Sequence, residues 1–177
     1  MTALTDEKIV VRIQSGETEI FGKIIDRYQR RLAGFIKKII GNHDEVDDLV
    51  ENSLVAAYVN IQDFDTKKKF SSWILRIAHN ITVDFIKKKK PLILPEDWDE
   101  ADKNNKLFEE MEIEREEKIK INGALEKLEL KYREVLVLKY FEDKSYEEIS
   151  DILHTSTSNV GVIIKRAKSK LREIYEK

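Results

Sequence analysis

The residues best suited to chemistry in this chain are aromatic and basic side chains that gather around residue 70. They are Phe64, Lys67, Lys68, Lys69, Phe70 and Trp73. Aromatic rings that stack bases, next to cations that follow a phosphate backbone, are typical of sites for single-stranded nucleic acid. The alternative is a plain core role, which suits Trp73 because the apolar step continues at Ile77. Phe64 lies in a polar loop and is harder to explain as core.

A second group of polar and basic residues lies near the C-terminus. The turn His154 to Ser156 separates two short amphipathic segments, which is typical of a helix-turn-helix motif. In that motif the start of the second helix meets base edges, while nearby cations hold phosphates. The residues expected on this face are Thr157, Ser158, Asn159, Lys165, Arg166 and Lys168. The alternative is a solvated basic face.

Catalysis finds little support in the sequence. Carboxylates are abundant, but no nucleophile with its base and no glycine-rich phosphate loop is present. The chain has no cysteine, and its three histidines, His43, His79 and His154, lack metal-ligand spacing. We therefore expect neither an enzyme nor a site for a metal, lipid or other cofactor.

The distribution of charge divides the chain into three parts. Its formal net charge is −2 overall, but +3 over residues 1–95, −8 over residues 96–117 and +3 over residues 118–177. Pro91 and Pro95 stand just before the acidic segment. This pattern predicts a domain over residues 1–91, an acidic linker over 92–117 and a second domain over 118–177.

The elements that must position these residues are helices. The sequence has 6 Gly and 2 Pro among 177 residues, and its apolar residues recur every three or four positions. Thr5 and Asp44 are expected to cap the first and third helices, and Ser145 with Glu148 matches a capping box. The prediction is an all-α fold of two small helical domains joined by an acidic linker, the second ending in a helix-turn-helix.

The sequence also bears on where the protein acts. No stretch approaches the roughly 18 apolar residues of a membrane-spanning helix. The first residues, which include Asp6 and Glu7, lack the basic start and apolar core of a signal peptide. We expect a soluble, cytoplasmic protein.

Three motifs resemble those of one known family. The run from Phe70 to Asp84, FSSWILRIAHNITVD, is similar to the F-x-S-W-L-x-x-I-A-x-N-x-x-x-D signature of bacterial RNA polymerase sigma factors. Upstream, DLVENSL over residues 48–54 resembles their D-L-x-Q-E-x-F segment, and downstream, the segment from Ser145 to Ala167 resembles their second DNA-binding domain. The small two-domain form is the extracytoplasmic-function (ECF) type.

The resemblance implies a role for each region. The first domain would bind core RNA polymerase and the minus-ten promoter element, with a polymerase contact at Asp48, Glu51 and Asn52. Phe64 and Lys67 to Lys69 would hold an unpaired base of the non-template strand. The cations and amide along the following helix would lie on the DNA, namely Arg76, Asn80, Lys87 and Lys88. The last helix would read the minus-thirty-five element, and an anti-sigma factor would be a further partner.

The sequence departs from the family pattern at two sites. Glu51, Asn52 and Leu54 stand where the family usually has Gln, Glu and Phe. In the last helix, Gly161 and Ile163 occupy positions where Lys and Arg are common, so Val162 and Ile163 offer only apolar contact to a thymine methyl group. We expect an unusual, T-rich upstream element.

Other interpretations remain open at this point. The chain could be a helix-turn-helix regulator that binds duplex DNA without polymerase, or a helical adaptor whose basic faces are merely solvated. The acidic linker could be a solvated tether or, as the resemblance implies, a segment that mimics polyphosphate within polymerase.

Overall fold

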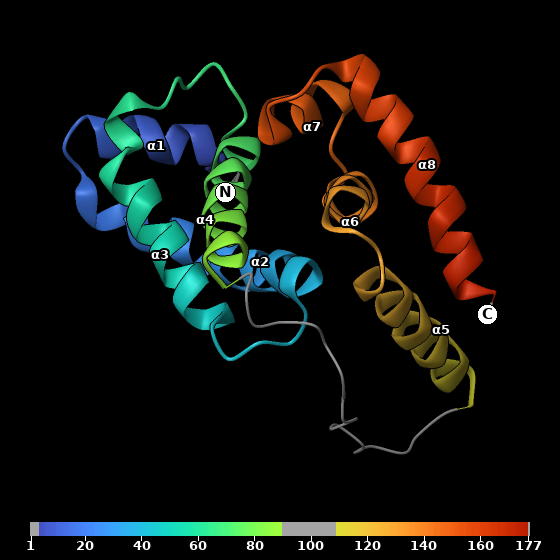
Figure 1. Ribbon diagram of the computed structural model, residues 1–177. Helices are drawn as coiled ribbons and strands as arrows, with labels where there is room; N and C mark the ends of the chain where they lie inside the picture. The colour runs from blue at the N-terminus through green and yellow to red at the C-terminus, as the bar shows by residue number, and fades with distance from the viewer. Residues whose placement is uncertain (1–3, 90–108, 177) are drawn as a thin grey trace.

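The computed structural model describes residues 4–89 and 109–176, and within them the chain is built from α-helices with no β-strand. The helices form two units (Figure 1), one from α1 to α4 and the other from α5 to α8. The predicted all-α fold is confirmed. The fold follows from the sequence because its apolar residues form stripes with a helical period and because Gly and Pro, which interrupt helices, are scarce.

The first unit has four α-helices and two short 3₁₀ segments. They are α1 Asp6–Gln14, η1 Thr18–Phe21, α2 Gly22–Ile40, α3 Val46–Val59, η2 Ile61–Asp63 and α4 Phe70–Lys89. Thr5 caps α1 as predicted, since its side chain accepts a hydrogen bond from the backbone of Lys8. The Asp44 cap was wrong: α3 begins at Val46, and Glu45 occupies the cap position without a side-chain hydrogen bond.

The core of the first unit lies between α2, α3 and α4, which pack against one another. Its largest fully buried side chains include Leu32 and Phe35 on α2 and Phe70 and Ile74 on α4. Gly41 ends α2 with a φ of 83°, a value that residues other than glycine rarely adopt. The chain can therefore turn sharply from α2 toward α3.

The second unit contains the predicted helix-turn-helix. Its elements are α5 Glu109–Glu126, α6 Leu130–Leu136, the π-helical η3 Val137–Phe141, α7 Tyr146–Leu153 and α8 Thr157–Tyr175. The capping box is confirmed, with Ser145 and Glu148 bonded reciprocally at the start of α7. His154 takes a left-handed conformation after α7, and Ser156 caps α8. These two local signals set the turn of the motif.

The predicted linker overlaps a helix. Because α5 begins at Glu109, residues 109–117 of the segment predicted as linker are helical. Residues 92–108 of that segment lie outside the described residues. A run of acidic residues thus does not by itself exclude a helix, because Glu is a good helix former.

The two units pack side by side. Helix α4 lies against α7, and α2 lies against α5, α6 and η3 (Figure 1). Buried side chains of both units belong to one apolar cluster. No helix in the described part of the chain is long and apolar enough to cross a membrane.

Candidate functional site

The loop before α4 is held in place by α1. The side-chain amide of Gln14 donates to the carbonyls of Ile61 and Phe64 at 2.8 and 2.9 Å. A carboxylate oxygen of Glu7 accepts the backbone N–H of Phe70 at 3.0 Å and so caps α4. The loop therefore has a defined path that presents its lysines to solvent.

Phe64 corrects one expectation from the sequence. It is only 5% exposed, and its ring lies 5.5 Å from that of Phe70 and 5.0 Å from that of Trp73. The view that Phe64 is hard to explain as core was wrong, because Phe70 and Trp73 form an aromatic cluster that extends under the loop. In this conformation Phe64 supports the loop and offers no free ring face to a base.

The cations near α4 remain accessible. Lys67, Lys68 and Lys69 are exposed in the loop, as are Asn80, Lys87 and Lys88 on the helix, while Arg76 is half-buried. Arg76, Asn80 and Lys87 share one face of α4, because steps of four and seven residues complete whole turns. Together with the loop they make a basic strip, defined here as Lys67 to Lys69, Arg76, Asn80 and Lys87.

Helix α8 exposes the predicted reading face in full. The residues predicted to contact bases or phosphates are all exposed: Thr157, Ser158, Asn159, Lys165, Arg166 and Lys168. The opposite side of the helix, with Val160, Ile164 and Ala167, is buried. Interaction with Tyr140 raises the pKa of Lys168, whose ammonium lies 5.2 Å from the centre of that ring. Lys168 is therefore protonated and positively charged on this face at neutral pH.

The structure changes the prediction that Val162 and Ile163 of α8 both offer apolar contact to a base. Val162 is 47% exposed, whereas Ile163 is half-buried and packs against the core. Apolar contact with a base thus falls to Val162 alone. At Gly161, an added Cβ would meet the ring of Tyr146 at 3.5 Å, an ordinary contact distance, so the packing does not explain the glycine.

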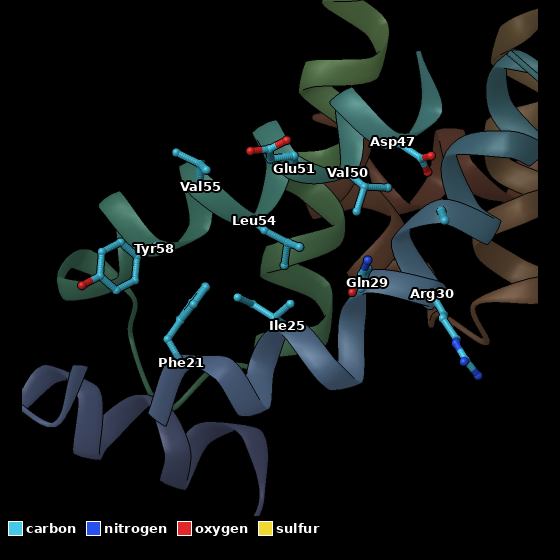
Figure 2. Close-up of a pocket in the computed structure, with 11 residues that line it drawn as sticks. Phe21, Ile25, Gln29, Arg30, Asp47, Val50, Glu51, Leu54, Val55 and Tyr58 are labelled. Carbon is cyan, nitrogen blue, oxygen red and sulfur yellow. The ribbon is translucent and has the colours of Figure 1, made fainter. Parts of the chain in front are cut away.

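A groove between α2 and α3 has a volume of about 900 Å³. Figure 2 shows side chains of both helices facing one another across it. Phe21 and Ile25 come from the η1–α2 side, and Val50, Leu54, Val55 and Tyr58 come from α3. Asp47 and Glu51 add carboxylates at its α3 edge, and Gln29 and Arg30 add an amide and a cation at its α2 edge, so the groove has an apolar floor with a charged rim.

The groove contains functional candidates that the sequence did not single out. Of the three residues predicted to meet polymerase, Glu51 lines the groove, while Asp48 and Asn52 are exposed elsewhere on α3. Ile25 and Tyr58 belong to the apolar residues that recur every three or four positions, a spacing typical of core, but they are 36% and 44% exposed. A signal existed: α3 has apolar residues on more of its circumference than one packed face requires.

A polar cluster joins the two units where α4 meets α7. The ammonium of Lys144, a residue only 4% exposed, lies 2.7 Å from the Ser71 hydroxyl and 3.1 Å from that of Ser72. Ser72 donates to Glu148 at 2.8 Å, and Lys69 lies 3.3 Å from the same carboxylate. Burial lowers the pKa of Lys144. Local sequence patterns do not indicate this cluster, because it joins residues more than seventy positions apart.

The charge state of Glu148 follows from its partners. Burial acts to raise its pKa, but hydrogen bonds from the Ser145 backbone and the Ser72 hydroxyl, with the nearby Lys144 charge, lower the pKa to about 2. Glu148 is thus ionised at neutral pH. In the described residues no cluster of three His, Asp or Glu side chains could hold a metal ion.

Comparison with known proteins identifies the family. The chain matches Sigma-70 region 2 over residues 24–91 and Sigma-70 region 4 over residues 118–171. The ECF RNA polymerase sigma factor SigW of Bacillus subtilis (strain 168) is 32% identical over 177 residues, covering 94% of this chain and 95% of the relative. The chain belongs to the ECF sigma factors. Like other members of this family, it works with RNA polymerase to direct promoter recognition.

Two more comparisons agree with this assignment. The RNA polymerase sigma factor NccH of Alcaligenes xylosoxydans xylosoxydans is 30% identical, covering 97% of this chain and 95% of the relative. The structure of CnrH in complex with the cytosolic domain of CnrY is 26% identical with a TM-score of 0.73, covering 97% of each chain. The two-unit helical fold is therefore one that ECF sigma factors adopt.

Proposed function

We propose that three separate surfaces of this ECF sigma factor divide the work of promoter recognition. The α2–α3 groove, which Glu51 lines, binds core RNA polymerase together with Asp48 and Asn52 elsewhere on α3. The basic strip on α4 binds the non-template strand of the minus-ten element. The exposed face of α8 reads the minus-thirty-five element in the major groove.

The groove is the natural site for a large protein partner. An apolar floor between two helices fits buried apolar anchors from a partner, and the carboxylates at its α3 edge favour a partner with basic side chains on that side. Asp47, Asp48 and Glu51 supply that acidity from one helix. The carboxylates of α3 would repel DNA phosphates, which separates this edge of the groove from the two basic surfaces.

The observation that carries the DNA assignment is the shared face of Arg76, Asn80 and Lys87 on α4. One helical face that presents cations and an amide in line can follow a phosphate backbone. Lys67 to Lys69 extend that line into the loop. Phe64 is not assigned to base stacking, because it is buried beneath the loop.

The α8 face supports direct reading of duplex DNA. Asn159 is exposed near the start of the helix, and an asparagine amide can bridge N6 and N7 of adenine. Lys165, Arg166 and Lys168 supply phosphate contacts farther along the helix. Val162 adds a contact suited to a thymine methyl group, which favours a T-rich element.

Two further parts of the proposal concern partners and place. An anti-sigma factor is a proposed partner, and the CnrH complex with a cytosolic domain supports a protein partner of that kind. We place the protein in the cytoplasm, where polymerase acts, and assign it no catalysis of its own.

The test is run-off transcription with core polymerase and a set of candidate promoters. The proposal predicts initiation that needs both core enzyme and this chain, together with co-elution of the two proteins. A DNA-binding regulator would bind duplex DNA but direct no initiation, and an adaptor would do neither. No co-elution and no transcript from any promoter would refute the proposal.

A further inference from the structure

The loop between η2 and α4 is held at both ends by helix α1. This helix contacts η2, where the loop begins, and α4, where the loop ends (Figure 1). At the first end, the side-chain amide of Gln14 donates to the carbonyls of Ile61, Gln62 and Phe64 at 2.8, 3.4 and 2.9 Å. One side chain of α1 therefore fixes the direction in which the backbone enters the loop.

At the other end of the loop, α4 depends on α1 for its N-terminal cap. Lys69 precedes Phe70, the first residue of α4, and a lysine side chain has no acceptor for the free N–H groups of a helix start. The carboxylate of Glu7, sixty-three positions upstream, accepts the Phe70 N–H at 3.0 Å instead. Because Glu7 supplies the cap, a cation can stand where many helices have Ser, Thr, Asp or Asn.

The middle of the loop is folded into a turn of its own. The Asp65 carboxylate accepts the Lys67 N–H at 3.0 Å, and the Asp65 carbonyl accepts the Lys68 N–H at 2.9 Å. Beneath the loop, the ring of Phe64 lies 5.0 Å from that of Trp73. A short loop with fixed ends and an internal turn presents its lysines in one arrangement.

Building on the proposed function, we propose that Gln14 and Glu7 are positioning residues for the minus-ten strand. Neither belongs to the basic strip, and both act through the loop that they hold. A loop that is already ordered loses little conformational freedom when DNA binds, so its contacts can discriminate between bases. A loop released from α1 keeps its charges and still attracts phosphates, but it can adjust to different bases. The loss should therefore be a loss of base preference.

The test variants remove the two anchors separately. Gln14→Leu removes the amide, and Gln62→Leu is its matched control, because the Gln62 side chain is exposed and makes no hydrogen bond within the described part of the chain. Glu7→Leu removes the acceptor at the start of α4, whereas Glu7→Gln keeps an oxygen there and should behave as the wild type. Glu19→Leu removes an exposed carboxylate from η1 and controls for the change in charge.

Trp73 reports the position of the loop before DNA is added. The sequence has two tryptophans, so a Trp98→Phe background leaves Trp73 as the only one. Quenching of Trp73 fluorescence by acrylamide should increase in Gln14→Leu and Glu7→Leu, and it should stay at the wild-type level in Glu7→Gln and both controls. Circular dichroism checks the helical fold of each protein.

Base preference is measured with each protein bound to core polymerase. The wild-type complex selects its preferred strand from a randomised single-stranded pool, and affinities are measured for that strand and its single-base variants. In Gln14→Leu and Glu7→Leu, the ratio of affinities for the preferred and the wrong base should fall about fivefold at the loop-contacting position. Affinity for duplex minus-thirty-five DNA should change less than about twofold. Partial unfolding lowers all affinities together, so it leaves the ratio unchanged.

An unchanged base preference in Gln14→Leu and Glu7→Leu would overturn the positioning role, whether or not the quenching of Trp73 increases. An equal loss of preference in Gln62→Leu would also overturn it, because the loss would then not depend on the contacts of α1. Failure of the surface assignment has a different signature. A wild-type complex that binds duplex minus-thirty-five DNA but no single strand would refute the assignment of the basic strip to DNA and, with it, the positioning role.

Discussion

The two units of this sigma factor differ in which of their candidate binding surfaces are apolar and which are charged. The first unit buries the aromatic cluster beneath its basic loop, keeps an apolar groove open between α2 and α3, and has one lysine of its basic strip, Lys69, paired with Glu148 of the second unit. The second unit leaves the polar and basic face of α8 free. Binding at an apolar groove depends on the apolar area that is buried, whereas DNA binding at a charged face depends on attraction to phosphates. Mutations and salt should therefore affect binding at the two surfaces differently.

The largest expected effect tests whether the aromatic cluster of the first unit is core. Phe64→Ala should lower the free energy of unfolding by about 3 kcal/mol, because it removes a buried ring and leaves a cavity. Urea denaturation measures it. Phe141→Ala, which truncates a 44% exposed ring, should cost less than about 1 kcal/mol. A Phe64 variant of unchanged stability that loses oligonucleotide binding would indicate that Phe64 contacts DNA and is not a core residue.

The next effect concerns the groove. Val55→Asp should weaken binding to core polymerase by about 2 kcal/mol, or about 30-fold, because it puts a charge on an apolar contact surface. Fluorescence anisotropy with labelled chain measures the affinity. Val11→Asp on α1 is the matched control, since Val11 and Val55 are 50% and 54% exposed. The loss should persist in high salt, and equal losses in both variants would remove the groove from the interface.

A smaller effect is expected on α8. Arg166→Ala should weaken binding of duplex minus-thirty-five DNA about fivefold and reduce the log–log salt slope by about 1, if it removes one phosphate contact. A salt titration of DNA affinity measures both. Arg172→Ala changes an exposed arginine farther along the same helix and is the control. A slope that does not change in Arg166→Ala would mean that this arginine contacts no phosphate.

The last effect concerns acid stability at the junction of the units and appears only at low pH. The pKa of Glu148 falls from an ordinary 4.5 to about 2 in the folded chain. Its charged form therefore stabilises the fold above about pH 4.5, and this contribution is lost as pH falls from 4.5 toward 2. Chemical denaturation across that range should give a stability gap between the wild type and Glu148→Gln that closes with acid.

The control for acid stability is Glu173→Gln, which removes an exposed carboxylate from α8. It should follow the wild type throughout the range. A Glu148→Gln variant that also follows the wild type would mean that the charge of Glu148 contributes nothing measurable to stability.

Local signals in the sequence predict structure well where they act over a few residues. The Thr5 cap, the Ser145–Glu148 capping box and the short turn before α8 each depend on neighbours within one helical turn. The outward face of α8 follows from its period of three and four residues. The Asp44 cap failed because several polar residues precede α3, and sequence alone does not say which of them the chain bends around.

Burial could not be predicted in the same way. Phe64 looked like a loop residue and is core, whereas Ile25 and Tyr58 looked like core and line an open groove. Helical periodicity says which residues share a face, but it does not say what covers that face. The cover comes from elements distant along the chain, such as the Phe70–Trp73 cluster that packs on Phe64.

The sequence by itself determined the all-α fold, the helix-turn-helix, the family and the helices that carry the basic residues, because each depends on local pattern or on linear motifs. Only the tertiary structure decided that α7 lies against α4 and that Lys144 and Glu148 are held between them. The physical reason is that a buried ion and its partners gain stability only when distant segments meet, and no local periodicity records that meeting.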